Sequence, residues 1–153
     1  MTTPLTPGRL SALARAASAD GTWRELVRYS ASGRWYQRME AAESHEMWLL
    51  SWLPGQGTGF HDHLGSAGVV AVVRGELTER TPRPGSAVTA ERVVGAGELR
   101  SFGPRHVHDV VNASSDPAVS IHAYSPPLAG MRRYQMTGSG LMLTALERAG
   151  VGW

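Results

Sequence analysis

The sequence predicts an all-β fold of the sandwich or barrel type, preceded by a short helical segment. The 153 residues include 18 glycines and nine prolines, which can supply the many turns that such a fold needs. Between residues 34 and 124 the apolar residues fall in short runs separated by glycine and proline, which is typical of closely spaced strands. No internal repeat of about 20–50 residues is present, so the sequence does not indicate a solenoid or a propeller.

A helix is predicted near the start of the chain, because apolar residues recur at helical spacing after Pro7. These residues are Leu10, Leu13, Ala14 and Ala17. The pair Asp20-Gly21 ends this helix, and a second short helix is predicted at 22–29. Nine strands then follow in order, at 35–41, 47–53, 59–63, 68–74, 77–81, 89–94, 98–102, 106–112 and 119–124. Residues 141–148 fit either a further strand or a last helix.

Composition and charge exclude several classes of protein. All 15 basic residues are scattered arginines and the net charge is +2, so we expect no nucleic-acid partner. No apolar run approaches the roughly 20 residues of a spanning helix, so we expect no membrane association. The absence of cysteine excludes disulfides and thiolate ligands. No secretory leader is predicted, so we expect a cytoplasmic protein, acting as a monomer.

Two pairs of histidines, each spaced two residues apart, are the candidate metal ligands. Side chains two apart on a strand point to the same face, so His61 and His63 can address one point. His106 and His108 form the second pair, and one of their rings could complete a three-imidazole site. Neutral imidazole nitrogens bind iron, zinc, copper or nickel well. Taken alone, either pair also fits two polar residues at a strand edge.

Ser120, His122 and Tyr124 follow the same two-residue spacing near the end of the last predicted strand. A hydroxyl, an imidazole and a phenol on one strand face can relay orientation or a proton. The alternative is a polar strand face that points to solvent. A serine hydrolase triad does not fit, because neither an acid partner nor a nucleophile elbow accompanies the serine.

The segment around Tyr36 could supply a substrate-binding side chain. If the face with Tyr36 and Arg38 looks into a cavity, Arg38 can clamp a carboxylate with two parallel hydrogen bonds. The apolar Trp35 and Met39 lie on the opposite face, and burial of that face would turn Gln37 inward instead. The residues alone leave open whether Gln37 or Arg38 enters the cavity.

Two further expectations concern side chains outside these motifs. Trp48, Leu50 and Trp52 alternate along one strand and are predicted to lie in the core. Glu76, Glu79 and Arg80 are expected on a solvated hairpin.

Taken together, these residues resemble the cupin superfamily. Its first motif is matched by Gly55, His61, His63 and Gly75, with Gly68 where the usual acid is expected. Its second motif is matched by Gly97, His108 and Asn112, with Gly103 and Arg105 in place of the expected proline and glycine. Within the cupins, the segments WYQR, FHDH, VVRGELTE and HDVVNASSDPAVSIHAYSPPL are similar to those of the bacterial cysteine dioxygenase family.

The resemblance covers residues 34–128 and implies a double-stranded β-helix, or jelly-roll barrel. On this basis residues 1–153 form a single cupin domain, with a helical segment at 1–30 and a barrel core at 34–128. The implied activity is that of a non-haem iron enzyme, which oxidises the small thiol L-cysteine with O2 as co-substrate to cysteine sulfinate.

The resemblance also implies a role for each motif residue. His61, His63 and His108 would hold one Fe(II) per chain, whereas His106 would not be a ligand. Ser120, His122 and Tyr124 would form a catalytic relay, and Arg38, with Tyr36 beside it, would bind the substrate carboxylate. In animal members a cysteine is crosslinked to the tyrosine. Gly68 stands at that position here, so the phenol must be held by hydrogen bonds alone.

Other functions remain open at this point. The substrate could be 3-mercaptopropionate or another small carboxylated thiol, and the branch that uses 3-mercaptopropionate typically has glutamine where the cysteine branch has arginine. A cupin that binds a metal without catalysis, as a ligand sensor, is the alternative from another class. A zinc or manganese isomerase is a third option, because three imidazoles do not exclude zinc.

Overall fold

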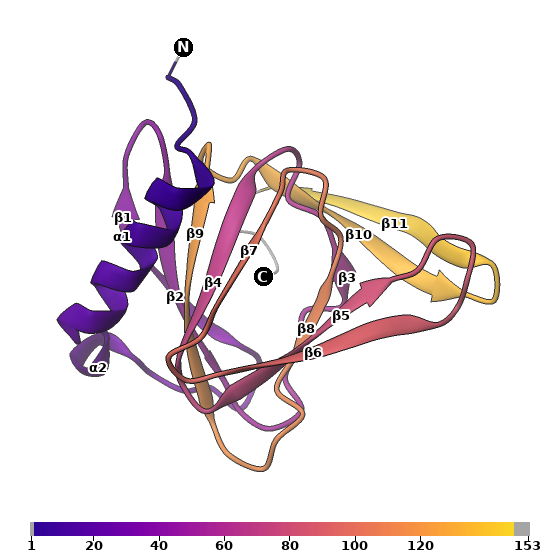
Figure 1. Cartoon of the computed structure of the whole chain (residues 1–153). Helices are drawn as coiled ribbons and strands as arrows, with labels where there is room; N and C mark the ends of the chain where they lie inside the picture. The colour runs from indigo at the N-terminus through magenta and orange to yellow at the C-terminus, as the bar shows by residue number, and fades with distance from the viewer. Residues whose placement is uncertain (1, 149–153) are drawn as a thin grey trace.

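The computed structural model describes residues 2–148, in which two helices precede eleven strands (Figure 1). The helices are α1 (Pro7–Asp20) and α2 (Trp23–Leu26). The strands are β1 (Trp35–Ala41), β2 (Glu46–Trp52), β3 (Phe60–His61), β4 (Ala67–Arg74), β5 (Glu76–Pro82), β6 (Thr89–Gly95), β7 (Leu99–Phe102), β8 (Asp109–Val111), β9 (Ala118–Ser125), β10 (Gly130–Thr137) and β11 (Gly140–Arg148). The predicted all-β class with a helical start is confirmed, and each of the nine predicted strands has a counterpart in β1–β9.

The strands form two layers. One layer is a five-stranded sheet in the order β1-β2-β9-β4-β7, in which all neighbours are antiparallel. The opposite layer consists of two three-stranded sheets, β11-β10-β3 and β6-β5-β8, which meet where β3 approaches the start of β8 (Figure 1). Among the described residues the hydrogen bonding does not close these sheets into one continuous barrel.

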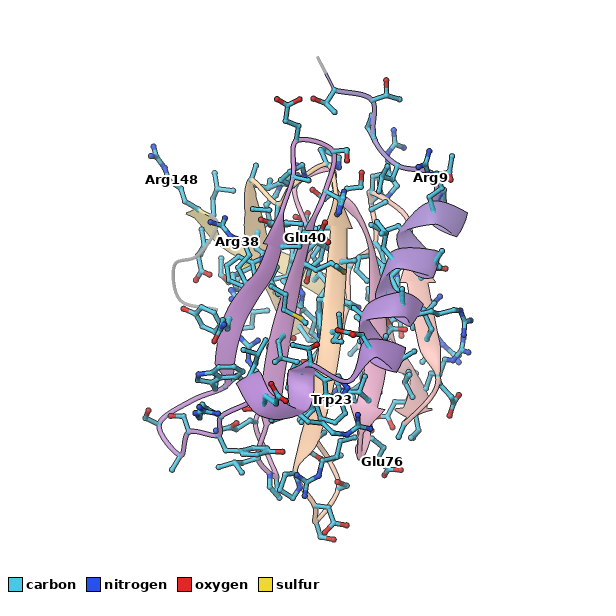
Figure 2. The ribbon with its side chains drawn as sticks, turned by 90° about the vertical axis from the view of Figure 1, so that its left-hand side faces the viewer. Arg9, Trp23, Arg38, Glu40, Glu76 and Arg148 are labelled. Atoms are coloured by element: carbon cyan, nitrogen blue, oxygen red, sulfur yellow. The ribbon has the colours of Figure 1, made fainter. Side chains whose placement is uncertain are left out.

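Helix α1 covers the outer face of the five-stranded sheet (Figure 2). The side-chain oxygen of Thr6 accepts a hydrogen bond from the backbone nitrogen of Arg9, and Pro7 occupies the first turn, where its missing N–H costs nothing. Gly21 ends the helix with a φ of 77°. Leu10 is buried against the sheet. The second helix ends earlier than predicted, because the chain takes an extended conformation at Val27.

Strand β9 separates the two cores of the molecule. Val119, Ile121 and Ala123 pack outward beneath the helices, in a cluster that includes Leu10 and Leu49. The alternate residues of β9 point inward, between the two layers. There they lie among the side chains of the inner cluster, whose members include Trp48, Leu50 and Trp52, the three residues predicted to be core. A polar stripe on β9 is therefore enclosed by apolar side chains.

Three elements differ from the sequence prediction. Strand β3 contains two residues, because the chain turns through Leu64 (φ 46°) and Gly65 (φ 91°) shortly after it. Strand β10 was missed: its residues do not alternate in polarity, and a bulge between Arg133 and Tyr134 interrupts its pairing with β11. Residues 140–148 form a strand, so the helical alternative is excluded. None of the described helices is long and apolar enough to cross a membrane.

We expect Leu10→Ala to lower the free energy of unfolding by about 2–5 kcal/mol, because its side chain is 1 % exposed and anchors α1 to the sheet. Leu146→Ala is the matched control, because that leucine on β11 is 68 % exposed and its truncation should change stability by about 0.5 kcal/mol or less. Urea denaturation followed by tryptophan fluorescence measures both. Equal losses in the two variants would show that α1 does not stabilise the sheet.

Candidate metal centre

Three histidine rings converge between the two layers of strands. His61 lies in β3, His63 follows it two residues later, and His108 precedes β8. Their ring centroids lie 4.8–5.0 Å apart, and one nitrogen from each ring lies within 4.8 Å of the others. His61 and His108 also exchange backbone hydrogen bonds of 2.9 and 3.1 Å. The structure thus brings the three predicted ligands to one point.

The nitrogen atoms of these rings fit a metal ion. Nδ1 of His61 lies 2.9 Å from the carbonyl oxygen of Gly59, and Nδ1 of His108 lies 2.7 Å from a carboxylate oxygen of Glu79. Both rings therefore carry a proton on Nδ1 and keep Nε2 as an acceptor. Both nitrogens of His63 are buried without a hydrogen-bond partner among the described residues. A metal dication would satisfy polar atoms that the protein leaves unpaired, so the site can hold one ion.

Burial keeps the three rings neutral. It lowers the pKa of His61 and His63 well below the usual value of 6.5, and the neighbouring histidines lower both further. Burial also lowers the pKa of His108, although the hydrogen bond to Glu79 opposes this shift. Neutral imidazole is the form that binds a metal, so these rings are ready to bind at neutral pH.

Glu79 orients His108 and is a functional residue that the sequence analysis missed. We expected it on a solvated hairpin, but its side chain is 5 % exposed. Its carboxylate accepts hydrogen bonds from His108 (2.7 Å), from Nε2 of His106 (3.1 Å) and from Nε of Arg100 (2.8 Å). Burial alone would raise the pKa of Glu79, but these three donors hold it well below its usual value. The signal was available, because Glu79 shares a strand face with the buried Leu77.

Ser120, His122 and Tyr124 form a buried hydrogen-bonded chain on the inner face of β9. The indole nitrogen of Trp52 donates to the Ser120 hydroxyl (2.9 Å), which lies 2.8 Å from Nε2 of His122. Nδ1 of His122 lies 3.2 Å from the phenol oxygen of Tyr124. Because no other acceptor for the Ser120 proton lies within hydrogen-bond distance among the described residues, Ser120 donates to Nε2 of His122. The Nδ1 proton of His122 is then donated to Tyr124. The phenol keeps its own proton for another acceptor.

Electrostatics keep this chain neutral. Burial lowers the pKa of His122 to about 3, and His108 and Arg34 lower it in the same direction. Burial raises the pKa of Tyr124 well above 10, against the opposing effect of Arg34. The Tyr124 ring centroid lies 5.4 Å from that of His63. Tyr124 is therefore a neutral hydrogen-bond donor beside the three-histidine cluster.

A narrow cavity opens beside the histidines, and two arginines contribute to its wall. Arg34 precedes β1, and Arg133 lies in β10. The wall is formed by Arg34, Trp48, Leu50, Thr58, His61, His108, Val110, His122, Tyr124, Met131 and Arg133. Neither arginine was singled out from the sequence, although Arg34 shares the two-residue spacing of Tyr36 and Arg38.

Tyr36 and Arg38 share the face of β1 that looks toward the inner core. They pair in register with Leu50 and Trp48, and the Tyr36 and Trp48 rings meet edge to face at 6.0 Å. The Arg38 side chain is 54 % exposed. It projects from the edge strand (Figure 2), lies over the Trp48 ring and approaches Glu46 to 3.8 Å. Gln37 lies on the outer face, opposite Leu49. Arg38 does not line the cavity, and its role in binding a carboxylate stays a prediction.

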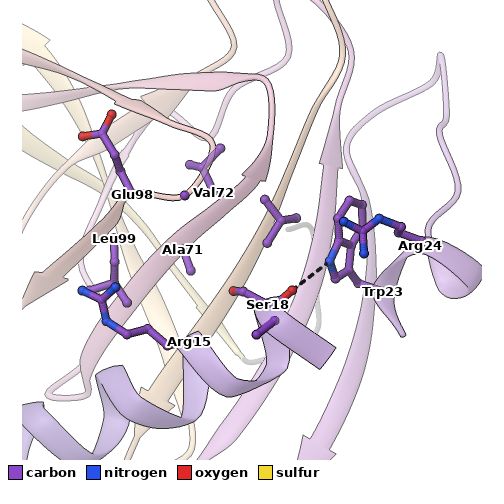
Figure 3. A pocket seen from close by; sticks show the side chains of 11 residues that line it. Arg15, Ser18, Trp23, Arg24, Ala71, Val72, Glu98 and Leu99 are labelled. Carbon is purple, nitrogen blue, oxygen red and sulfur yellow. Dashed lines mark hydrogen bonds between the residues drawn. The ribbon is translucent and has the colours of Figure 1, made fainter. Parts of the chain in front are cut away.

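A larger groove of about 330 Å³ lies on the other side of the five-stranded sheet, where the helices meet β4 and β7 (Figure 3). Arg15, Trp23 and Arg24 from the helices line it together with Glu98 and Leu99. The indole of Trp23 donates to the backbone of α1 and fixes the corner between the helices (Figure 3). This groove contains no histidine, so the metal chemistry belongs to the narrow cavity.

Solved structures of similar fold define the class of this protein. A protein from Thermus thermophilus, TT1209, has a TM-score of 0.60 at 25% identity over 68% of this chain and 93% of its own. A protein with a double-stranded β-helix domain from Klebsiella pneumoniae has a TM-score of 0.57 at 19% identity, over 80% and 94%. Other neighbours are described as cupins. The chain therefore has the cupin fold, with the three-histidine cluster inside it.

The sequence comparisons then give the family. The family model for cysteine dioxygenase type I matches residues 9–137. The chain belongs to this family. A cysteine dioxygenase type 1 from Danio rerio is 31% identical over 100 residues, which cover 59% of this chain and 50% of that protein. The chain thus spans about half the length of this curated relative.

We expect Glu79→Gln to weaken metal binding about 10- to 100-fold, because the amide no longer attracts the His108 Nδ1 proton as a carboxylate does. The matched control is Glu76→Gln on the same strand, where the side chain is exposed. Competition with a chromophoric chelator measures the affinity for Fe(II) or Zn(II) in both variants. A wild-type affinity in Glu79→Gln would show that His108 is oriented without this carboxylate.

The metal-free protein should lose stability as the pH falls below about 6.5. The buried histidines have folded-state pKa values well below their unfolded values, so acid favours the unfolded chain. Each histidine that titrates only when unfolded lowers the free energy of unfolding by about 1.4 kcal/mol per pH unit. Denaturant titrations at pH 7.5, 6 and 5, with a chelator present, measure the slope. His122→Asn should reduce it, and a flat profile would contradict the burial of neutral rings.

Proposed function

We propose that this protein is an iron-dependent thiol dioxygenase, which converts the thiol of a small carboxylated substrate to a sulfinate. One observation carries the proposal: three buried imidazoles, each offering one nitrogen to the same point, stand beside a phenol that a buried hydrogen-bonded chain orients as a donor. Family membership supports the reaction class. L-cysteine is the substrate that the family description names, and 3-mercaptopropionate is the alternative that lacks the amino group.

Different residues bind the metal, donate the proton and exclude water in this reaction. His61, His63 and His108 would hold Fe(II), which supplies binding positions for the thiolate and for O2. Tyr124 would donate its remaining proton to the bound substrate, while His122 fixes the direction of the phenol. Apolar side chains of the cavity, such as Trp48, exclude water from the reacting groups.

The reaction balances without a further reductant. Both oxygen atoms of O2 form bonds to sulfur, so the thiol R–SH becomes the sulfinic acid R–SO2H. The sulfur loses four electrons, and O2 accepts the same number. No residue of the chain has to be oxidised, which fits a site whose side chains are imidazoles, a phenol and a hydroxyl.

Oxygen uptake by the Fe(II)-loaded protein tests the proposal. We expect uptake with L-cysteine or with 3-mercaptopropionate, and a product heavier than the thiol by two oxygen atoms in mass spectrometry. Tyr124→Phe should keep its iron and lose about 100-fold or more of the turnover, because one preorganised donor is removed. Tyr29→Phe is the control, since Tyr29 is an exposed tyrosine bonded to Arg74.

Two results would overturn the proposal. Iron bound with wild-type affinity but no oxygen uptake with any small thiol would instead support a metal-binding cupin that senses a ligand. Unchanged turnover in Tyr124→Phe would remove the buried chain of β9 from the reaction.

A further inference from the structure

His106 lies beside the metal centre and contacts the residues that support two of its ligands. Its Nε2 donates to the Glu79 carboxylate (3.1 Å), and the same carboxylate oxygen accepts the Nδ1 proton of His108 (2.7 Å). Its ring stacks on Phe102 with the centroids 5.2 Å apart, and Phe102 stacks in turn on His63 at 4.7 Å. His106 thus reaches His108 through a shared acceptor and His63 through a shared ring.

A short turn after β7 brings His106 to this place. Phe102 is the last residue of β7, and the backbone nitrogen of His106 donates to the carbonyl oxygen of Gly103 (3.2 Å). The His106 side chain is 17 % exposed, whereas those of His108 and Glu79 are 3 % and 5 % exposed. His106 is therefore a more exposed partner of a carboxylate that is buried against a metal ligand.

Two donors on one carboxylate oxygen share its negative charge. Each donor withdraws electron density from the oxygen, so Oε2 of Glu79 attracts the Nδ1 proton of His108 less strongly while His106 also donates to it. A carboxylate that attracts this proton makes the imidazole a stronger electron donor at its other nitrogen, Nε2. Arg100 donates to the other oxygen of Glu79 (2.8 Å) and acts in the same direction as His106.

We propose that His106 is a positioning residue that limits the charge which Glu79 passes to His108, and that it thereby favours Fe(II) over Fe(III) at the three-histidine centre. This inference rests on the proposed function, because it concerns the iron of that reaction. Fe(III) gains more than Fe(II) from an electron-rich ligand, so a second donor on the carboxylate favours the lower charge. The reaction needs this control, since it balances without a reductant that could regenerate Fe(II).

Three variants separate the hydrogen bond of His106 from its ring. His106→Phe keeps a ring stacked on Phe102 and removes the donor. His106→Gln removes the ring and keeps a donor, because the amide nitrogen of glutamine is as many bonds from Cβ as Nε2 of histidine is. Arg105→Gln changes an exposed neighbour in the same turn and is the matched control.

An anaerobic redox titration of the iron-loaded protein measures the Fe(III)/Fe(II) midpoint potential. We expect His106→Phe to raise the preference for Fe(III) about 3- to 10-fold, and a tenfold change lowers a one-electron potential by about 59 mV. Glu79→Gln should raise the potential instead, because it removes the charge that reaches His108. His106→Gln and Arg105→Gln should stay within about twofold of the wild-type preference.

Opposite shifts in His106→Phe and Glu79→Gln support the inference, because a role in packing alone would move both variants in the same direction. An unchanged potential in His106→Phe, a rise as in Glu79→Gln, or a loss of iron binding overturns it. A potential in His106→Gln that matches His106→Phe also overturns it, since the ring and not the hydrogen bond would then be responsible.

Two further measurements complete the test. Glu79, His106 and His108 could together hold an ion of their own. Binding of two Zn(II) ions per wild-type chain and one per His106→Phe chain would therefore make His106 a ligand and overturn the inference. The predicted shifts without oxygen uptake from any thiol would support the role of His106 at the metal and overturn the dioxygenase function. Oxygen uptake with an unchanged potential in His106→Phe would do the reverse.

Discussion

The register of β9 decides where the polar side chains of the site lie. Side chains alternate between the two faces of a strand, so a slip of one residue would exchange the two faces completely. Ser120, His122 and Tyr124 would then meet α1, and Ile121 would enter the cavity. Pairing with β2 on one side and with β4 on the other holds the observed register, and the apolar cluster beneath the helices favours the same one. The core and the site are thus specified by one strand.

The burial of neutral imidazoles is the second constraint. A buried nitrogen without a partner destabilises the folded state by about 1–3 kcal/mol, and within residues 2–148 His63 has two such atoms. His61 and His108 avoid part of this cost, because Gly59 and Glu79 accept their Nδ1 protons. The site therefore leaves buried nitrogens without hydrogen bonds, and the same three rings supply all the nitrogens that a three-histidine metal site needs. Metal binding should stabilise the fold, since it satisfies atoms that neither protein groups nor apolar packing can.

The sequence predicted those parts of the site that depend on local spacing. The two-residue rule identified the histidine pairs and the stripe on β9, because alternation is a property of the strand itself. The same rule could have placed Glu79 inside, next to Leu77, but two neighbouring charges suggested a solvated hairpin. Local spacing could not predict the part played by Arg133, because it reaches the cavity only through the pairing of β10 with β3.

Strand β10 was missed for a related reason. Its residues combine two adjacent arginines with a bulge, so no regular alternation of apolar and polar side chains marks it in the sequence. Its place is defined by what it pairs with, β3 and β11, and not by its own pattern. The wall of a cavity between two layers depends on such pairings, whereas the ligands at its base lie on strands that the pattern already reveals.

Gly68 shows how one small residue shapes the metal centre. It pairs with Tyr124 across β4 and β9, and a Cβ atom there would overlap the Phe102 ring and come within 3.1 Å of Tyr124. Phe102 fills this space and stacks on His63, with their ring centroids 4.7 Å apart. The glycine therefore admits an aromatic ring that packs against His63, which has no hydrogen-bond partner among the described residues. Because residue 68 has no side chain that could form a covalent link to Tyr124, the phenol depends on His122 for its orientation. This dependence explains why the hydrogen-bonded chain from Trp52 through Ser120 to His122 has to be buried and complete.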